Sequence, residues 1–158
     1  MQDTIRKDLE NLRESRINSM GRTVNRLRMH FSSRVMIKMQ ELGYSTCTYQ
    51  HTAVFANIDI EGSNIVTLAD RAKISKQAMS KLVKDIEEKG YVETIKDPKD
   101  SRAVLVLLTD KGAKLIIDVQ QCINEIRAEM DAALGKEKVD IFLSIANEMS
   151  NHFEEKQK

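Results

Sequence analysis

The residues best placed for chemistry lie on one face of a helix predicted between Ser75 and Lys89. At about 100° per residue, its polar half carries Lys76, Gln77, Ser80, Lys81 and Lys84. Its other half carries Ala78, Met79, Leu82, Val83 and Ile86. Ammonium groups bind phosphates, and amide and hydroxyl groups bind base edges. Acidic residues appear only in the last turns, so this face predicts contact with DNA; the alternative is a solvated surface helix.

The segment before this helix predicts a helix-turn-helix. Ser75 is a suitable N-cap for the second helix, and Gly90 can provide its left-handed C-terminal stop. The run from Thr67 to Asp70 resembles a capping box that starts a short helix to about Ala72. Residues 73–75 then form the tight turn between the two helices.

A hairpin is expected next, with strands over 91–96 and 102–108. Pro98 suits the second position of a type I turn at its tip. Asp100 lies two residues before Arg102 and can orient the guanidinium, which a narrow minor groove attracts. A hairpin after a recognition helix predicts a winged helix. The alternative for this pair is a surface ion pair of less than about 1 kcal/mol.

These motifs resemble the MarR family of bacterial transcription regulators over Thr48 to Gly112. The most specific part is the Asp-Pro-x-Asp-x-Arg tip, followed by Leu-Thr-x-x-Gly. The resemblance implies an obligate homodimer that binds a palindromic double-stranded operator and usually represses. It also implies release by a small aromatic or lipophilic effector or an oxidant. The implied DNA-binding residues are Thr67, Ser75, Lys76, Gln77, Ser80, Lys81, Lys84, Lys99, Asp100 and Arg102.

The charge of the chain is segregated, although the net charge of its 158 residues is only +1. Residues 1–40 carry nine Lys and Arg against four Asp and Glu, whereas residues 112–158 carry six against nine. Affinity for DNA depends on where the cations lie, so the neutral total does not argue against DNA binding. The two ends could also interleave across a twofold axis.

Long amphipathic helices are predicted on both sides of this lobe. Residues 1–45 form one helix bent near Gly21, or two in line, and residues 112–158 form two helices separated at Gly135. Their apolar stripes extend beyond a compact winged helix (46–111), so a second copy should cover them. The fold is therefore mainly α with a small β-hairpin wing. The dimerisation candidates are Leu9, Leu12, Ile116, Ile123, Phe142 and Met149.

An effector pocket is expected where the first long helix meets the lobe. The candidates for its lining are Met36, Met39, Tyr44, His51 and Phe55, with core packing as the alternative. Cys47 lies in a predicted loop beside a helix N-terminus, which can lower a thiol pKa, so a redox-sensing regulator is a second hypothesis. Cys122 is expected to pack, and His51 to help cap a helix that starts near Thr48.

Other function classes have little support. There is no Gly-rich phosphate loop, nucleophile motif or zinc-type spacing, so neither an enzyme nor a cofactor or metal is expected. No membrane-spanning stretch or signal peptide is apparent, which favours the cytoplasm. A winged helix used only for protein contacts is the remaining rival. It predicts no salt-dependent binding to duplex DNA.

Overall fold

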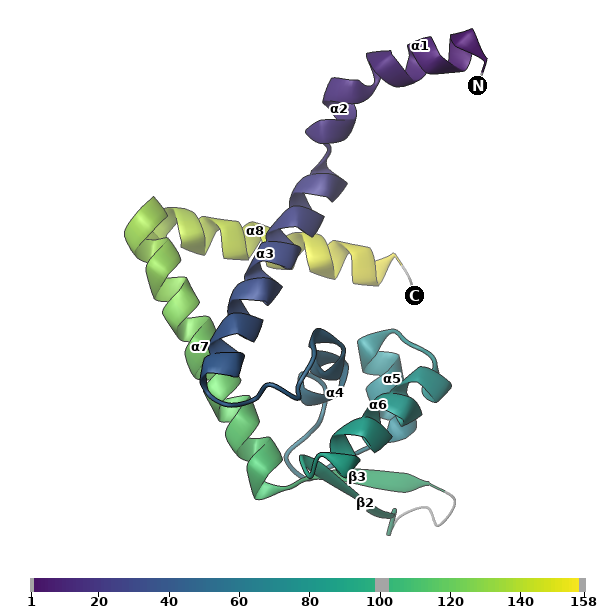
Figure 1. Ribbon diagram of the computed structural model, residues 1–158, viewed down its shortest axis with the longest axis vertical. Helices are drawn as coiled ribbons and strands as arrows, with labels where there is room; N and C mark the ends of the chain where they lie inside the picture. Colours follow the sequence, from purple (N-terminus) through teal and green to yellow (C-terminus); the bar gives the residue numbers. More distant parts are fainter. Residues whose placement is uncertain (1, 99–102, 157–158) are drawn as a thin grey trace.

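The computed structural model describes residues 2–98 and 103–156, and it is mainly helical with a small antiparallel sheet, as predicted (Figure 1). The N-terminal helices are α1 (Asp3–Asn11), α2 (Arg13–Ile17) and α3 (Met20–Glu41). The lobe contains η1 (Tyr49–His51), α4 (Thr52–Phe55), β1 (Ser63–Asn64), α5 (Ile65–Ala72), α6 (Lys76–Glu88), β2 (Val92–Lys96) and β3 (Val104–Leu108). The C-terminal helices are α7 (Asp110–Leu134) and α8 (Lys136–Glu155).

The lobe lies at one end of the molecule, below the long helices (Figure 1). α7 leads out of the lobe and packs against α3, and α8 turns back from the far end of α7. α1 and α2 project away from everything else. The winged helix is therefore carried on α3 and α7, and any rotation of these helices would move it.

The N-terminal segment breaks at positions that the pattern did not predict. α1 gives way to α2 at Leu12, and a second break at Asn18 separates α2 from α3. Ser19 caps α3 by accepting a hydrogen bond from the Arg22 N–H at 3.3 Å. The break expected near Gly21 lies at Asn18 and Ser19, where α2 ends and α3 begins, so separate helices form and Gly21 lies inside the first turn of α3.

The sheet has the order β1-β3-β2, and all its pairs are antiparallel. β2 and β3 form the predicted hairpin, with Val92 opposite Leu108 and Lys96 opposite Val104. β1 was not predicted, because two residues carry no alternation. Gly62 precedes it at φ +89°, where an added Cβ would lie 2.5 Å from a Leu107 methyl. That glycine lets the loop before β1 lie directly on β3.

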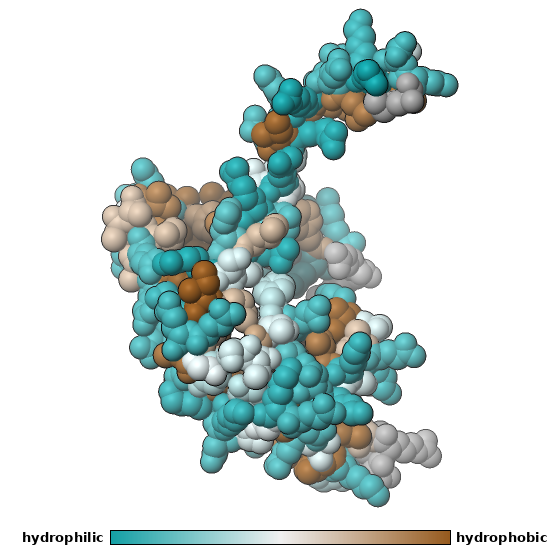
Figure 2. Space-filling model, in the orientation of Figure 1, coloured by the Kyte–Doolittle hydropathy of each residue, from teal (hydrophilic) through white to brown (hydrophobic). Residues whose placement is uncertain are grey.

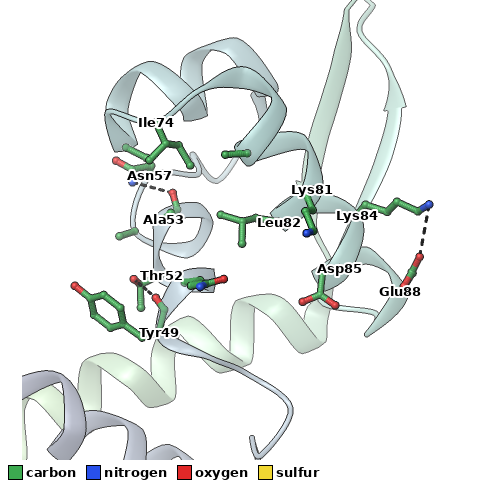
Figure 3. A pocket seen from close by; sticks show the side chains of 14 residues that line it. Tyr49, Thr52, Ala53, Asn57, Ile74, Lys81, Leu82, Lys84, Asp85 and Glu88 are labelled. Carbon is green, nitrogen blue, oxygen red and sulfur yellow. Dashed lines mark hydrogen bonds and ion pairs between the residues drawn. The ribbon is translucent and has the colours of Figure 1, made fainter.

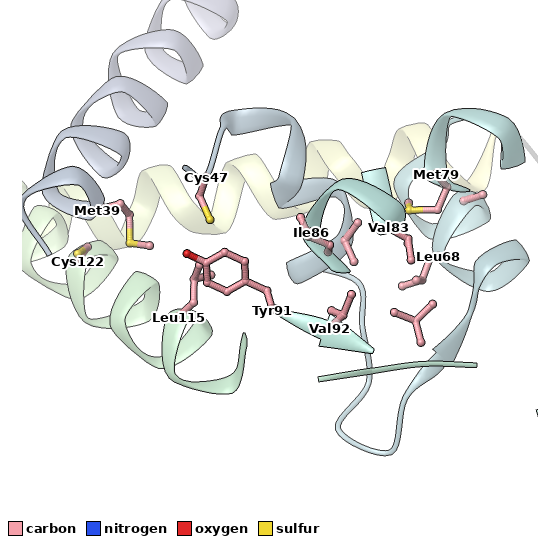
Figure 4. Packing of buried hydrophobic residues seen from close by; sticks show 13 residues of the cluster. Met39, Cys47, Leu68, Met79, Val83, Ile86, Tyr91, Val92, Leu115 and Cys122 are labelled. Atoms are coloured by element: carbon pink, nitrogen blue, oxygen red, sulfur yellow. The ribbon is translucent and has the colours of Figure 1, made fainter. Parts of the chain in front are cut away.

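One apolar core joins the lobe to the long helices (Figure 4). Its centre in the lobe is Leu68, Met79 and Ile86, all fully buried. It continues past Tyr91 to Leu115 on α7 and Met39 on α3. Because close-packed interiors transmit displacement, the lobe and its supporting helices are mechanically coupled.

The junction of wing and α7 explains the Leu-Thr-x-x-Gly motif. Thr109 caps α7 by accepting from the Gly112 N–H at 3.1 Å, and its hydroxyl donates to the Gly90 carbonyl at 2.8 Å. A Cβ on Gly112 would lie 2.0 Å from the Tyr91 carbonyl oxygen. Only glycine lets α7 start this close to Tyr91, just beyond the end of α6.

Candidate nucleic-acid interface

The predicted capping and burial of α6 are confirmed. The Ser75 hydroxyl accepts from the Ala78 N–H at 3.2 Å, and Gly90 has φ +76° just after the helix. Met79, Val83 and Ile86 are buried, and Leu82 is half-buried. Ala78 is exposed, contrary to the wheel, because it lies at the edge of the apolar stripe in the first turn. The lobe core therefore holds α6 by one stripe and leaves its other side open.

The polar face predicted for α6 is presented to solvent. Lys76, Gln77, Lys81 and Lys84 are exposed, and Ser80 is half-buried. Lys84 lies 4.0 Å from Glu88, an exposed pair that contributes little. Within residues 2–98 and 103–156, neither Lys76 nor Lys81 takes part in an ion pair. These ammonium groups have no internal function that would compete with a phosphate.

The first helix of the helix-turn-helix starts earlier than predicted. Asn64 is its N-cap, with Oδ1 accepting from the Thr67 N–H at 2.8 Å, so α5 begins at Ile65. The predicted capping box at Thr67 was therefore wrong: Thr67 lies in the first turn, and the extended Asn64 at the end of β1 supplies the cap. The tight turn is confirmed, with Lys73 in the left-handed region at φ 54°.

The base of the wing is described, but its tip is not. The Asp97 N–H donates to the Ala103 carbonyl at 3.0 Å, which closes the hairpin beyond β2 and β3. Lys99, Asp100 and Arg102 lie outside the described residues, as does the completion of the turn at Pro98. Their roles at DNA stay predictions.

Two of the three acidic residues of α6, Glu87 and Asp85, bind groups of the lobe. Glu87 accepts from the Thr94 hydroxyl on β2 at 2.6 Å. Asp85 accepts from both Lys89 and His51, each at 2.6 Å. The hydrogen bond from Lys89, and then that from His51, lowers the pKa of Asp85. These carboxylates are attached to the lobe, so they do not offset the lysines of the first turns.

Four of the five predicted pocket residues, Met39, Tyr44, His51 and Phe55, lie in or against the packed interior. Met39 and His51 are buried, Phe55 lies edge-on to Tyr91 at 6.0 Å between ring centroids, and Met36 is half-buried on α3. The Tyr44 hydroxyl donates to Asp118 of α7 at 2.6 Å. None of the five lines the groove between α4 and α6 or the groove along α1, α2 and the start of α3.

The larger groove lies on the lobe surface between α4 and α6, with a volume of about 1140 Å³ (Figure 3). Its floor is apolar and includes Ala53, Ile74 and Leu82. Lys81 and Lys84 line it from α6, beside Asp85. The sequence carried no signal for this groove, because small alanines from separate helices create it.

The cysteines do not have the environment predicted for redox chemistry. Cys47 is buried, and burial raises the pKa of its thiol, which is the opposite of the predicted activation. Cys122 is buried on α7 as expected, and its thiol pKa is also raised by burial. Over the described ranges, no group of His, Cys, Asp or Glu has the arrangement of a metal site. Likewise, no helix there is long and apolar enough to cross a membrane.

None of the predicted dimerisation residues is fully buried in the single chain. Leu9, Leu12 and Phe142 are 40%, 51% and 49% exposed. Ile116, Ile123 and Met149 are half-buried. Figure 2 shows hydrophobic surface on the projecting α1–α2 arm and at the end of the molecule where α7 meets α8.

The known proteins that this chain matches are transcriptional regulators. Residues 47–103 match the model of the MarR family. The regulator SarZ of Staphylococcus saprophyticus is 28% identical over 68% of this chain and 74% of its own. The chain spans between about half and three quarters of the length of the curated relatives it matches.

Solved structures share the fold. A MarR regulator from Methanosarcina mazei has a TM-score of 0.70 at 22% identity, covering 85% of this chain and 96% of that one. PcaV of Streptomyces coelicolor, solved with its natural ligand, has a TM-score of 0.64 at 18% identity, covering 85% and 93%. With the winged lobe, the family match over residues 47–103 and the curated relatives in agreement, the chain carries the winged-helix lobe of the MarR family of transcriptional regulators.

Proposed function

We propose that the chain is a sequence-specific regulator that binds duplex DNA as a homodimer, represses by occupying a pseudo-palindromic operator, and is released by a small ligand. The observation that carries this proposal is the exposed polar face of α6, with lysines, Gln77 and Ser80 on one side and the core on the other. Such a face supplies both phosphate neutralisation and base-edge contacts. A protein that acts on operator DNA would work in the cytoplasm.

The homodimer is supported by the apolar side chains that the single chain leaves exposed on α1, α3 and α8. Under this proposal the regions 1–45 and 112–158 join the two copies, while 46–111 binds DNA. A twofold axis would repeat the recognition helix, so half-sites should lie about 10 bp apart or a near multiple of that spacing. Rotating the helices that carry the lobes would misplace both recognition helices and weaken binding.

A small aromatic or lipophilic effector is the proposed trigger of that rotation. PcaV, which shares this fold, was solved with its natural ligand. The oxidant alternative has less support, because Cys47 is buried and its thiol pKa is raised.

The test is selection of duplexes from a randomised pool by the full chain, followed by affinity measurements over a range of salt. A regulator should enrich a symmetric motif, and its affinity should fall steeply as salt rises. Enrichment of no motif, or binding insensitive to salt, would overturn the proposal in favour of a winged helix that contacts only proteins.

Single substitutions distinguish the predicted contacts of the cationic side chains from the predicted contact with a base edge. Lys81→Ala should weaken all duplexes alike and lower the salt slope by about one, and Arg102→Ala should weaken binding across operators. Gln77→Ala should instead change base preference, at a cost of about 1–3 kcal/mol on the selected motif. Lys136→Ala on α8, an exposed lysine far from the lobe, is the matched control. Unchanged binding in all three lobe variants would contradict the assigned face.

A further inference from the structure

His51 is a buried ionisable residue to which DNA binding assigns no part. It lies in η1 and is only 2% exposed. Its Nδ1 is 3.0 Å from the backbone nitrogen of Thr48, and its Nε2 is 2.6 Å from Asp85 Oδ2 on α6. The imidazole thus joins the start of η1 to the recognition helix.

These two contacts allow one protonation form of the ring. The Thr48 N–H can only donate, so Nδ1 must be the unprotonated acceptor. Asp85 is held ionised by Lys89, so its carboxylate accepts, and Nε2 must carry the hydrogen. The neutral Nε2–H tautomer satisfies both contacts. A proton on Nδ1 would face the Thr48 donor and break that bond.

The position of this link matters for α6. The core holds α6 along one stripe, Met79, Val83 and Ile86, and hydrophobic attraction is itself not directional. A hydrogen bond between charged and neutral partners is directional. The loop that ends at Thr48 is itself attached to α7, because Tyr44 in this loop donates to Asp118.

We propose that His51, as its neutral Nε2–H tautomer, is a positioning residue that sets the rotation of α6 relative to the loop leaving α3, and so aligns the DNA-contacting side chains. This proposal rests on the proposed function. It assigns His51 no contact with DNA: the side chain acts through Asp85.

The tautomer can be measured on the full chain without DNA. Long-range proton–nitrogen correlation spectra of ¹⁵N-histidine-labelled protein report which ring nitrogen carries hydrogen. The His51 signals should show a protonated Nε2 and a bare Nδ1, and they are assigned by their loss in His51→Asn. A hydrogen on Nδ1 at neutral pH would overturn the proposal, even if no variant folded.

Two substitutions of His51 each keep one of the two hydrogen bonds of the ring and remove the other. His51→Asn places an oxygen near the position of Nδ1 and keeps the Thr48 acceptor, but it loses the donor to Asp85. His51→Gln places a nitrogen near Nε2 and keeps that donor, but it loses the acceptor. With a duplex selected by the wild-type chain, His51→Asn should lose about tenfold in affinity, and His51→Gln should stay within about threefold of wild type. Both should bind an unrelated duplex normally, because the lysines of α6 remain.

A double-mutant cycle tests the route through Asp85. In an Asp85→Ala background, His51→Asn should cause no further loss on the selected duplex. His152→Asn, at an exposed position on α8, is the matched control and should behave as wild type. Additive losses of affinity in the double variant would overturn the proposal. The proposal would also fail if the His51 variants lowered only the thermal stability and left the ratio of affinities for the selected and the unrelated duplex unchanged, because His51 would then have a structural role alone. If the wild-type chain enriches no duplex, the proposed function itself fails, which is a different result.

Discussion

At the scale of single residues, the acidic side chains of α6 have a function beyond leaving the first turns cationic. Glu87 is bound by Thr94 of the wing, and Asp85 by His51 and Lys89. The order of charges along the helix therefore combines two requirements. Lysines face outward where phosphates would lie, and carboxylates anchor the helix to its lobe.

The sequence pattern correctly predicted several hydrogen bonds between residues three positions apart in the chain. Ser75 and Thr109 cap their helices as expected, and the His51 ring accepts from the Thr48 N–H. The prediction that Thr67 caps α5 was wrong, because Asn64, at the end of a strand that was not predicted, supplies the cap. The His51–Asp85 contact spans 34 positions, so no spacing rule could reveal it.

Gly112 is expected to be intolerant of any side chain. Gly112→Ala would place a Cβ 2.0 Å from the Tyr91 carbonyl oxygen, so α7 must move away from the lobe. We expect the free energy of unfolding to fall by about 2–3 kcal/mol, measured by urea denaturation. Gly21→Ala is the matched control, because it also lies in the first turn of a helix and nothing lies within 4 Å of its Cβ position. That variant should be neutral or stabilised by up to about 1 kcal/mol. Equal stabilities for the two variants would refute the close approach.

At the scale of elements, the attachment of α3 to α7 supports the lobe. Lys38 of α3 lies 2.7 Å from Glu125, and Arg34 lies 2.5 Å from Glu129. Part of the charge complementarity between the two ends of the sequence is therefore used within one chain, where the sequence suggested pairing between two. The Arg34 and Glu129 side chains are 52% and 42% exposed, so this pair contributes little to stability, whereas Lys38 is only 20% exposed.

At the lobe end of the same junction, a hydrogen bond joins the loop after α3 to α7. Tyr44 donates to Asp118, which also accepts from Lys114. The hydrogen bond from Lys114, and then that from Tyr44, lowers the pKa of Asp118. Burial, together with this hydrogen bond, raises the pKa of Tyr44 to about 12. The phenol is thus held in its neutral, donating form.

This contact predicts a loss of stability in alkali. A tyrosine in the unfolded chain has a pKa of about 10, so the contribution of Tyr44 is complete below that pH and disappears as the pH rises toward about 12. Tyr44→Phe should lower the free energy of unfolding by about 1–2 kcal/mol at pH 7. The difference between wild type and variant should shrink above about pH 10, in denaturant titrations at each pH. A difference that does not change up to pH 12 would be evidence against this assignment. Tyr49→Phe, at an exposed position, is the control.

At the scale of the whole molecule, most of the exposed large apolar side chains lie on the helices outside the lobe. α1, α2 and much of α3 carry exposed apolar side chains, including Ile5, Leu12, Val24 and Leu27. Within the described residues, α1 and α2 bury none of their side chains, although their apolar spacing is regular. Isolated helices of this length are marginal in water, which argues for a covering surface in the active assembly.

Replacing Phe142 with a charged residue tests that assembly. Phe142→Asp should convert a dimer into a species with the mass of one chain, 18.0 kDa, in sedimentation equilibrium. Affinity for a selected two-half-site duplex should fall with it, because the two recognition helices no longer bind as one unit. Asn147→Asp adds the same charge about 140° around α8 and serves as the control. A wild-type chain that sediments as a monomer at all concentrations would exclude the homodimer.

The sequence by itself determined the elements of the winged lobe and its polar face. Caps, left-handed stops and one-face periodicity act over three or four residues, so they can be recognised in the chain without knowledge of its partners. The wing tip is also defined in sequence by Asp100 and Arg102, which lie outside the described residues.

Only the tertiary structure decided how that face is held. It brought Asp85 to His51, placed Gly112 against Tyr91, and buried Cys47 and Met39. Each of these outcomes depends on segments that meet only after the core has packed. Burial and long-range hydrogen bonds are properties of that packing, and the same residue types would behave differently with other neighbours.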